Sequence, residues 1–199
     1  NRIMKILIDN GHGINTPGKC SPDGKLKEWA YTRFLAEGII ESLKAKGYDA
    51  ERIVHEDIDI SLGERCRRVN CFCNKLGKDN VLLVSVHCNA AGNGQWMTAR
   101  GWSAYTTPGH TKSDILAESL YTAAAKIING QHFRTDRSDG DSDIEERFYI
   151  LKNTNCAAVL TENLFQDNKE DVSFLLSDLG KSAIIELHVE GIINYIKKL

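Results

Sequence analysis

Three short apolar runs constrain the fold of this chain more than any other feature of its sequence. They are Lys5–Asp9, Val81–Val86 and Ala157–Thr161. Continuous apolar runs of this length, without alternating polar positions, are typical of strands that are buried on both faces of a sheet. Such sheets are mostly parallel, and parallel strands need a long crossover, which is usually a helix.

Helical patterns occupy the segments between these runs. We expect helices over Leu26–Lys46, Ser61–Leu76, Ser113–Ile128 and Gly180–Lys198. We expect further strands over Tyr48–Val54 and Trp102–Thr106, a polar loop over His132–Glu145 and a short extended piece over Tyr149–Leu151. The alternation of strands and helices, with no linker or repeat, predicts one α/β domain over residues 1–199. Its sheet should be mostly parallel and twisted, with helices on both faces.

The composition limits the partners of the chain. Of the 199 residues, 42% are hydrophobic and 26% charged, and the formal net charge is -2. We therefore expect neither nucleic-acid nor membrane binding. Asn1 to Ile3 precede Met4, and we interpret them as an addition to the natural chain. The chain does not begin with a signal peptide, which leaves open phage-type release, a cytoplasmic location, or export with a signal already removed. No pattern indicates an oligomeric state.

Six cysteines are present: Cys20, Cys66, Cys71, Cys73, Cys88 and Cys156. A chain of this length does not need disulfides as staples, so we expect reduced and partly buried thiols. Three of the cysteines lie between residues 66 and 73 but lack paired C-x-x-C spacing, which disfavours a metal site there.

Four aspartates lie close together in the polar loop, at Asp136, Asp139, Asp141 and Asp143. They suggest a calcium loop. The spacing lacks the closing glutamate of an EF-hand, and no flanking helix pair fits. We therefore expect a solvated acidic loop.

Reactive side chains follow each apolar run. His12, His87 and Glu162 come just after the three runs, and Glu28 lies near the start of the first helix. The carboxyl ends of parallel strands line the ligand crevice of such sheets, so these side chains can meet. Two imidazoles and one carboxylate are a common catalytic zinc set, and a further carboxylate outside the metal shell can act as general base. A structural histidine at a strand end is the alternative reading.

Several motifs resemble those of one enzyme family. They are Ile6–Gly13 with Gly11-His12-Gly13, Glu28 at the start of a helix, Leu62–Asn70, Leu83–Ala90, Gly101–Tyr105, and Val159–Phe165. Together they resemble the zinc-dependent N-acetylmuramoyl-L-alanine amidases called Amidase_3, the catalytic domains of cell-wall autolysins and phage endolysins. The resemblance implies one zinc ion per chain, with His12, Glu28 and His87 as ligands and Glu162 as the catalytic carboxylate. The implied substrate is peptidoglycan or a muropeptide, cut between N-acetylmuramic acid and L-alanine. The loop Ile14–Cys20 and the residues Asn163 and Leu164 depart from the usual pattern.

Three further residues are candidates for substrate contact. Asn89 lies two positions past His87. Trp96 lies in a glycine-rich loop, and Arg134 lies in the polar loop, where it could pair with a carboxylate of the peptide stem. Core packing for Trp96 and a surface salt bridge for Arg134 are the alternatives.

Two other functions remain open at this point. One is a zinc peptidase or carboxypeptidase of similar architecture, which needs an arginine to clamp the terminal carboxylate. The other is a peptidoglycan-binding module without catalysis, which would have no need of Glu162.

Overall fold

The three apolar runs form the centre of one sheet in the computed structural model, which describes residues 3–199. The strands are β1 (Lys5–Asn10), β2 (Asp49–Arg52), β3 (Val81–Asn89), β4 (Ser103–Thr106), β5 (Ile144–Glu145) and β6 (Ala157–Phe165). Within the described residues, six strands lie in the order β2-β1-β3-β6-β4-β5. All neighbouring pairs are parallel except β4 with β6. The expectation of a mostly parallel sheet is confirmed.

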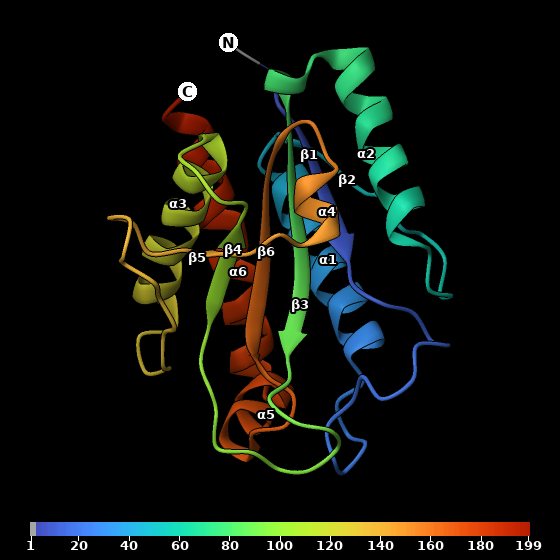
Figure 1. Cartoon of the computed structure of the whole chain (residues 1–199), viewed down its shortest axis with the longest axis vertical. Coiled ribbons are helices and arrows are strands. Elements are labelled where there is room, and N and C mark those ends of the chain that lie inside the picture. The colour runs from blue at the N-terminus through green and yellow to red at the C-terminus, as the bar shows by residue number, and fades with distance from the viewer. Residues whose placement is uncertain (1–2) are drawn as a thin grey trace.

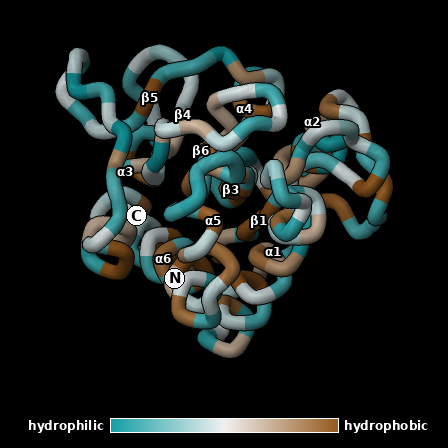
Figure 2. Tube along the Cα trace, turned by 90° about the horizontal axis from the view of Figure 1, so that it is seen from below, coloured by the Kyte–Doolittle hydropathy of each residue, from teal (hydrophilic) through white to brown (hydrophobic). Residues whose placement is uncertain are grey.

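Helices cover both faces of this sheet (Figure 1). They are α1 (Glu28–Ala45), α2 (Leu62–Leu76), α3 (Lys112–Ile127), α4 (Tyr149–Lys152), α5 (Lys169–Leu176) and α6 (Asp178–Lys197), with a 3-10 turn at Lys78–Asn80. Ile6 and Ile8 of β1 face a core shared with α1, α3 and α6, whereas Leu7 faces α2 and α4. This alternation follows from the two-residue period of a strand. In Figure 2 much of the apolar trace lies near β1 and β3, and the rim loops are more hydrophilic.

Three elements differ from the sequence expectation. The piece Tyr149–Leu151 is helical rather than extended, because Ile150 and Leu151 are both buried on the α2 side, and consecutive residues of a strand would face opposite sides. Strand β6 continues past Thr161 to Phe165, so Glu162 lies inside the strand. Helix α5 was not expected. Its N-cap is Asn168, whose side chain accepts a hydrogen bond from the Asp171 amide.

Two expectations concern the first residues of the chain and membrane binding. The interpretation of Asn1 to Ile3 as an addition falls largely on residues 1 and 2, which lie outside the described residues. Among residues 3–199, no helix has both the length and the apolar character needed to cross a bilayer.

Candidate active site

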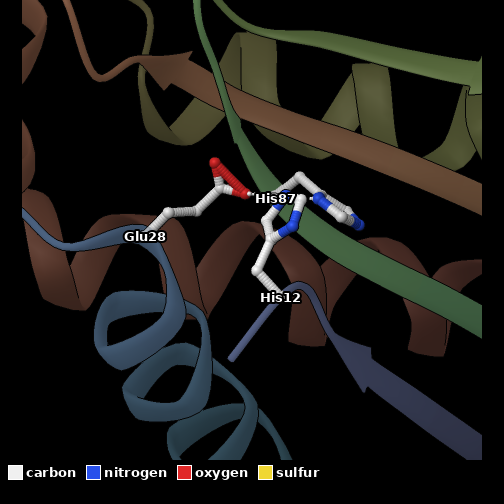
Figure 3. A group of neighbouring side chains, drawn as sticks. All are labelled: His12, Glu28 and His87. Atoms are coloured by element: carbon white, nitrogen blue, oxygen red, sulfur yellow. Dashed lines mark hydrogen bonds and ion pairs between the residues drawn. The ribbon is translucent and has the colours of Figure 1, made fainter. Parts of the chain in front are cut away.

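The structure brings His12, Glu28 and His87 together at the carboxyl ends of β1 and β3 (Figure 3). The Glu28 Oε2 atom lies 2.8 Å from His12 Nε2 and 3.3 Å from His87 Nδ1. One ligand atom from each residue lies within 4.8 Å of the other two. Ligand atoms on a tetrahedral zinc, at about 2.0–2.1 Å from the ion, are roughly 3.4 Å apart. The three donors therefore fit a small tetrahedral cation with one position left over.

Glu28 is the buried anion of this group. It is the first residue of α1 and is 1% exposed. Burial alone would raise the pKa of Glu28, but hydrogen bonds with His12 and His87 outweigh burial and hold that pKa at about 2. Glu28 therefore presents a carboxylate to the two imidazoles over the whole neutral range.

The backbone of His12 has a strained conformation that neighbouring residues hold in place. It has a φ of 61°, in the left-handed region that non-glycine residues rarely adopt. Arg65 and Arg33 donate to the His12 carbonyl oxygen, at 3.1 and 3.0 Å. The neighbouring Gly13 packs so closely that an added Cβ would lie 2.0 Å from the Asp59 amide nitrogen. Two arginines and one close backbone contact thus compensate for the strain at His12.

The ring of His87 is oriented by a relay of buried side chains. His87 Nε2 lies 3.0 Å from Ser85 Oγ, which donates to Asp9 Oδ2 at 2.6 Å, and Asp9 pairs with Arg65 at 2.7 Å. Because Ser85 gives its only proton to a carboxylate, it can only accept from His87 Nε2–H. The Nδ1 atom that faces Glu28 is then the nitrogen that would bind a metal, in place of its hydrogen bond to Glu28. Gly11 makes room for this ring, since an added Cβ would lie 2.3 Å from His87 Cε1.

Glu162 lies beside His87, its partner in the β3–β6 register. The residue keeps some exposed surface, but its Oε2 atom is buried and has no hydrogen-bond partner among the described residues. Burial raises the pKa of Glu162 to about 8, with His87 lowering it and Glu28 raising it further. A carboxyl group with this pKa can both accept and release a proton near neutral pH.

A bulge in β6 follows Glu162, where three residue steps oppose two steps of β3. Asn163 fastens this bulge by donating to the His87 carbonyl and to Thr161 Oγ1, both at 3.0 Å, and by accepting from Trp102 Nε1 at 2.8 Å. Thr161 in turn contacts the buried His188 on α6 at 2.9 Å. The residues on both sides of Glu162 are thus fixed by one buried network.

Comparison with known proteins identifies the family. Residues 6–194 match the family model described as N-acetylmuramoyl-L-alanine amidase (Amidase_3). This chain belongs to that family.

Two curated relatives and one solved structure are similar to this chain, the relatives in sequence and the solved structure in fold. An endolysin of Bacillus phage SPP1 is 28% identical over 94% of this chain and 64% of its own length. The amidase CwlM of Bacillus licheniformis is 29% identical over 96% of this chain and 68% of its own length. The chain thus spans about two thirds of the length of these relatives. The crystal structure of an N-acetylmuramoyl-L-alanine amidase from Clostridium difficile 630 superposes with a TM-score of 0.81, at 24% identity, over 99% of this chain and 98% of that one.

Two of the expected substrate contacts lie close to Glu162 in this amidase fold. Asn89 ends β3, and its side chain hydrogen-bonds the hydroxyl of Tyr105. Burial raises the pKa of Tyr105, and the charges of Glu162 and Arg134 both act on that hydroxyl. The guanidinium of Arg134 also lies over the Phe165 ring, 5.2 Å from its centroid. Asn89 and Arg134 therefore both lie near the Tyr105 hydroxyl, on which the charge of Glu162 also acts.

Trp96 lies elsewhere. It packs partly against the main core, with Lys169 over its ring at 5.8 Å, and lines a hollow formed with the loop at Asp23 and with α5. The residues that line this hollow do not include His12, Glu28 or His87.

The side chains that orient this site were not singled out from the sequence. Asp9 and Ser85 stand inside apolar strands, where a short polar residue can be buried without function. An ionisable residue in the apolar run Lys5–Asp9 was the available signal, because a buried aspartate needs a partner. The partner, Arg65, is 56 residues away in the sequence, and only the fold shows the pairing.

Proposed function

We propose that this chain hydrolyses the amide bond between N-acetylmuramic acid and L-alanine in peptidoglycan, with one zinc ion held by His12, Glu28 and His87. The observation that supports this most directly is the donor set of two imidazoles and one carboxylate beside Glu162, whose buried Oε2 atom has no hydrogen-bond partner among residues 3–199. Zinc, when bound, supplies Lewis acidity toward a carbonyl oxygen and makes water more acidic. The remaining steps belong to the side chains.

Glu162 acts as the general base and then as the general acid. Its carboxylate takes a proton from the attacking water as the new C–O bond forms, and passes that proton to the leaving amine nitrogen as the C–N bond breaks. A pKa of about 8 suits the second transfer, and a cation nearby would lower this pKa and so favour the first. We propose that Asn89 and Arg134 orient the substrate, and that Trp96 contacts sugar or peptide farther away.

Digestion of purified muropeptides tests this proposal. Mass analysis should show free stem peptides that begin with L-alanine, together with intact disaccharides. Release of a terminal amino acid or cleavage within the stem would indicate a zinc peptidase or carboxypeptidase instead. Binding without any cleavage by the zinc-loaded protein would indicate a binding module.

A further inference from the structure

A second cluster of ionisable side chains lies outside the active site, where the polar loop meets α3. His110 precedes α3, Asp114 lies in its first turn, and Asp141 lies in the loop before β5. One ligand atom from each lies within 4.8 Å of the other two, and His110 Nδ1 is 4.0 Å from Asp114 Oδ2. The neighbouring Asp143 is 1% exposed, so the expectation of a fully solvated loop is wrong at this position.

The Asp143 carboxylate is buried without enough hydrogen-bond donors. Its Oδ1 atom has no donor group among the described residues, and neither has Oδ1 of Asp141, and these two carboxyl groups lie against each other. The other Asp143 oxygen contacts Thr106 Oγ1, which also lies 3.0 Å from Asp114 Oδ1. A hydroxyl group has a single proton and cannot donate to both carboxylates. One carboxylate oxygen therefore faces oxygen lone pairs, and the cluster lacks positive charge.

No basic side chain supplies that charge. Within residues 3–199, no lysine or arginine forms an ion pair with Asp139, Asp141, Asp143 or Glu145. Burial and the negative charges of Asp143 and Asp139 raise the pKa of Asp141 to about 7, and burial raises the pKa of Asp143. Carboxylates that are crowded and desolvated in this way need a proton or a cation.

We propose that this cluster is a second metal site, in which His110, Asp114 and Asp141 bind one divalent cation and the buried Asp143 beside them adds negative charge. Carboxylate oxygens suit Ca²⁺ and Mn²⁺, and an imidazole ligand favours Mn²⁺ over Ca²⁺. The cation bridges α3 to the end of the polar loop. Strand β5 pairs with β4 through only two residue pairs, Tyr105 with Ile144 and Thr106 with Glu145. A bound cation that links the loop before β5 to α3 therefore stabilises a weakly paired edge of the sheet.

The site is distinct from the proposed zinc site. Strand β4 runs antiparallel to β6, with Ser103 opposite Glu162 and Tyr105 opposite Leu160. Thr106 therefore lies at the end of β4 that points away from Glu162. A cation at this place stabilises the fold and takes no part in hydrolysis.

Cation titration of the zinc-loaded protein tests the proposal, because the first site is then already filled. Calorimetry with CaCl₂ and with MnCl₂ should show one further equivalent bound per chain. At about 100 times the Kd, the Tm should rise by roughly 5–10 °C. Asp141→Asn should abolish both effects, and Asp143→Asn, which removes a neighbouring negative charge, should weaken binding. The matched control is Asp136→Asn, an exposed position in the same loop whose side chain caps the Ser138 amide, and it should bind as the parent does.

His110→Ala separates the two cations. If the imidazole is a ligand, this change weakens Mn²⁺ binding by about tenfold or more and leaves Ca²⁺ binding little changed. Should Asp143→Asn fail to fold, the less buried Asp141→Asn decides the question. The proposal is wrong if neither cation binds at millimolar concentration, or if binding is the same in the Asp141 and Asp143 variants. The proposal is also wrong if two results occur together without metal: Asp143→Asn stabilises the protein, and the parent becomes more stable as the pH falls through 7. In that case protons shared between the carboxyl groups, and no cation, neutralise the cluster.

Discussion

Replacing Glu162 with glutamine separates chemistry from metal binding in one variant. Glutamine keeps the shape of the side chain but cannot take a proton from water at neutral pH. Turnover of the zinc-loaded protein should fall by roughly 10²–10⁴, the usual size of a general acid–base contribution. Zinc content should stay near that of the parent, because Glu162 is outside the proposed ligand set. Muropeptide cleavage and metal analysis of the same preparation measure both quantities.

The same substitution should stabilise the metal-free protein. The pKa of Glu162 is 4.5 in the unfolded reference and about 8 in the folded chain. The folded state therefore binds more protons between these values, and stability falls as the pH rises from about 4.5 to about 8. At pH 7 the penalty is at most about 3 kcal/mol. Removing it should raise the Tm of metal-free Glu162→Gln by up to roughly 6–12 °C.

Glu28→Gln is the matched control. A neutral amide is a poorer zinc ligand, so zinc occupancy should fall together with activity. If Glu162→Gln loses zinc while Glu28→Gln retains it, the two carboxylates have each other's roles. A metal-free Glu162→Gln protein that melts below the parent at pH 7 would refute the claim that the carboxyl group is buried at a cost. In that case the Oε2 atom has a partner in solution.

Three further substitutions test the surroundings of the site. Ser85→Ala removes the acceptor of His87 Nε2–H and should weaken zinc binding by roughly 10–100-fold in a chelator competition; an unchanged Kd would mean that the ring needs no orienting partner. Asn89→Ala should lower turnover and leave zinc occupancy near normal, and loss of zinc would show that its role is misassigned. Asn163→Ala leaves Trp102 Nε1–H and the His87 carbonyl without partners and should cost roughly 2–5 kcal/mol in urea unfolding, whereas a loss under 1 kcal/mol would show that water replaces the amide.

The central strands and long helices could be predicted from the sequence because each depends on a local pattern. Unbroken apolar runs predicted β1 to within one residue and the start of β3, although β3 continues three residues farther, to Asn89. The helix expected over Ser61–Leu76 matches α2, for which Ser61 is the N-cap. The short pieces failed for the same reason. The segment Tyr149–Leu151 is too short to show a period, and burial of two consecutive side chains against α2 decided its conformation.

The candidate site divides in the same way. Residues at the carboxyl ends of strands were predictable, because a parallel sheet brings those ends to one edge. His12 and His87 do meet there, together with Glu28 from the start of α1. The orienting side chains were not, because Asp9, Ser85 and Arg65 become partners only through strand register and helix packing. In the acidic loop, polar composition alone predicted that Asp143 is exposed to solvent. In the structure Asp143 is buried, in contact with Thr106.

Backbone strain is concentrated beside the proposed chemistry. Among residues 3–199, the non-glycine residues with positive φ are His12 at 61° and Leu164 at 65°. One carries a proposed zinc ligand, and the other lies in the bulge directly after Glu162 and Asn163. Each left-handed residue costs on the order of 1–2 kcal/mol, which only surrounding contacts can offset. Arg33 and Arg65 hold the first, and Asn163 holds the bulge that contains the second. The two strained positions bring a proposed zinc ligand and a proposed proton acceptor to one edge of the sheet, and regular strands alone would not place both there.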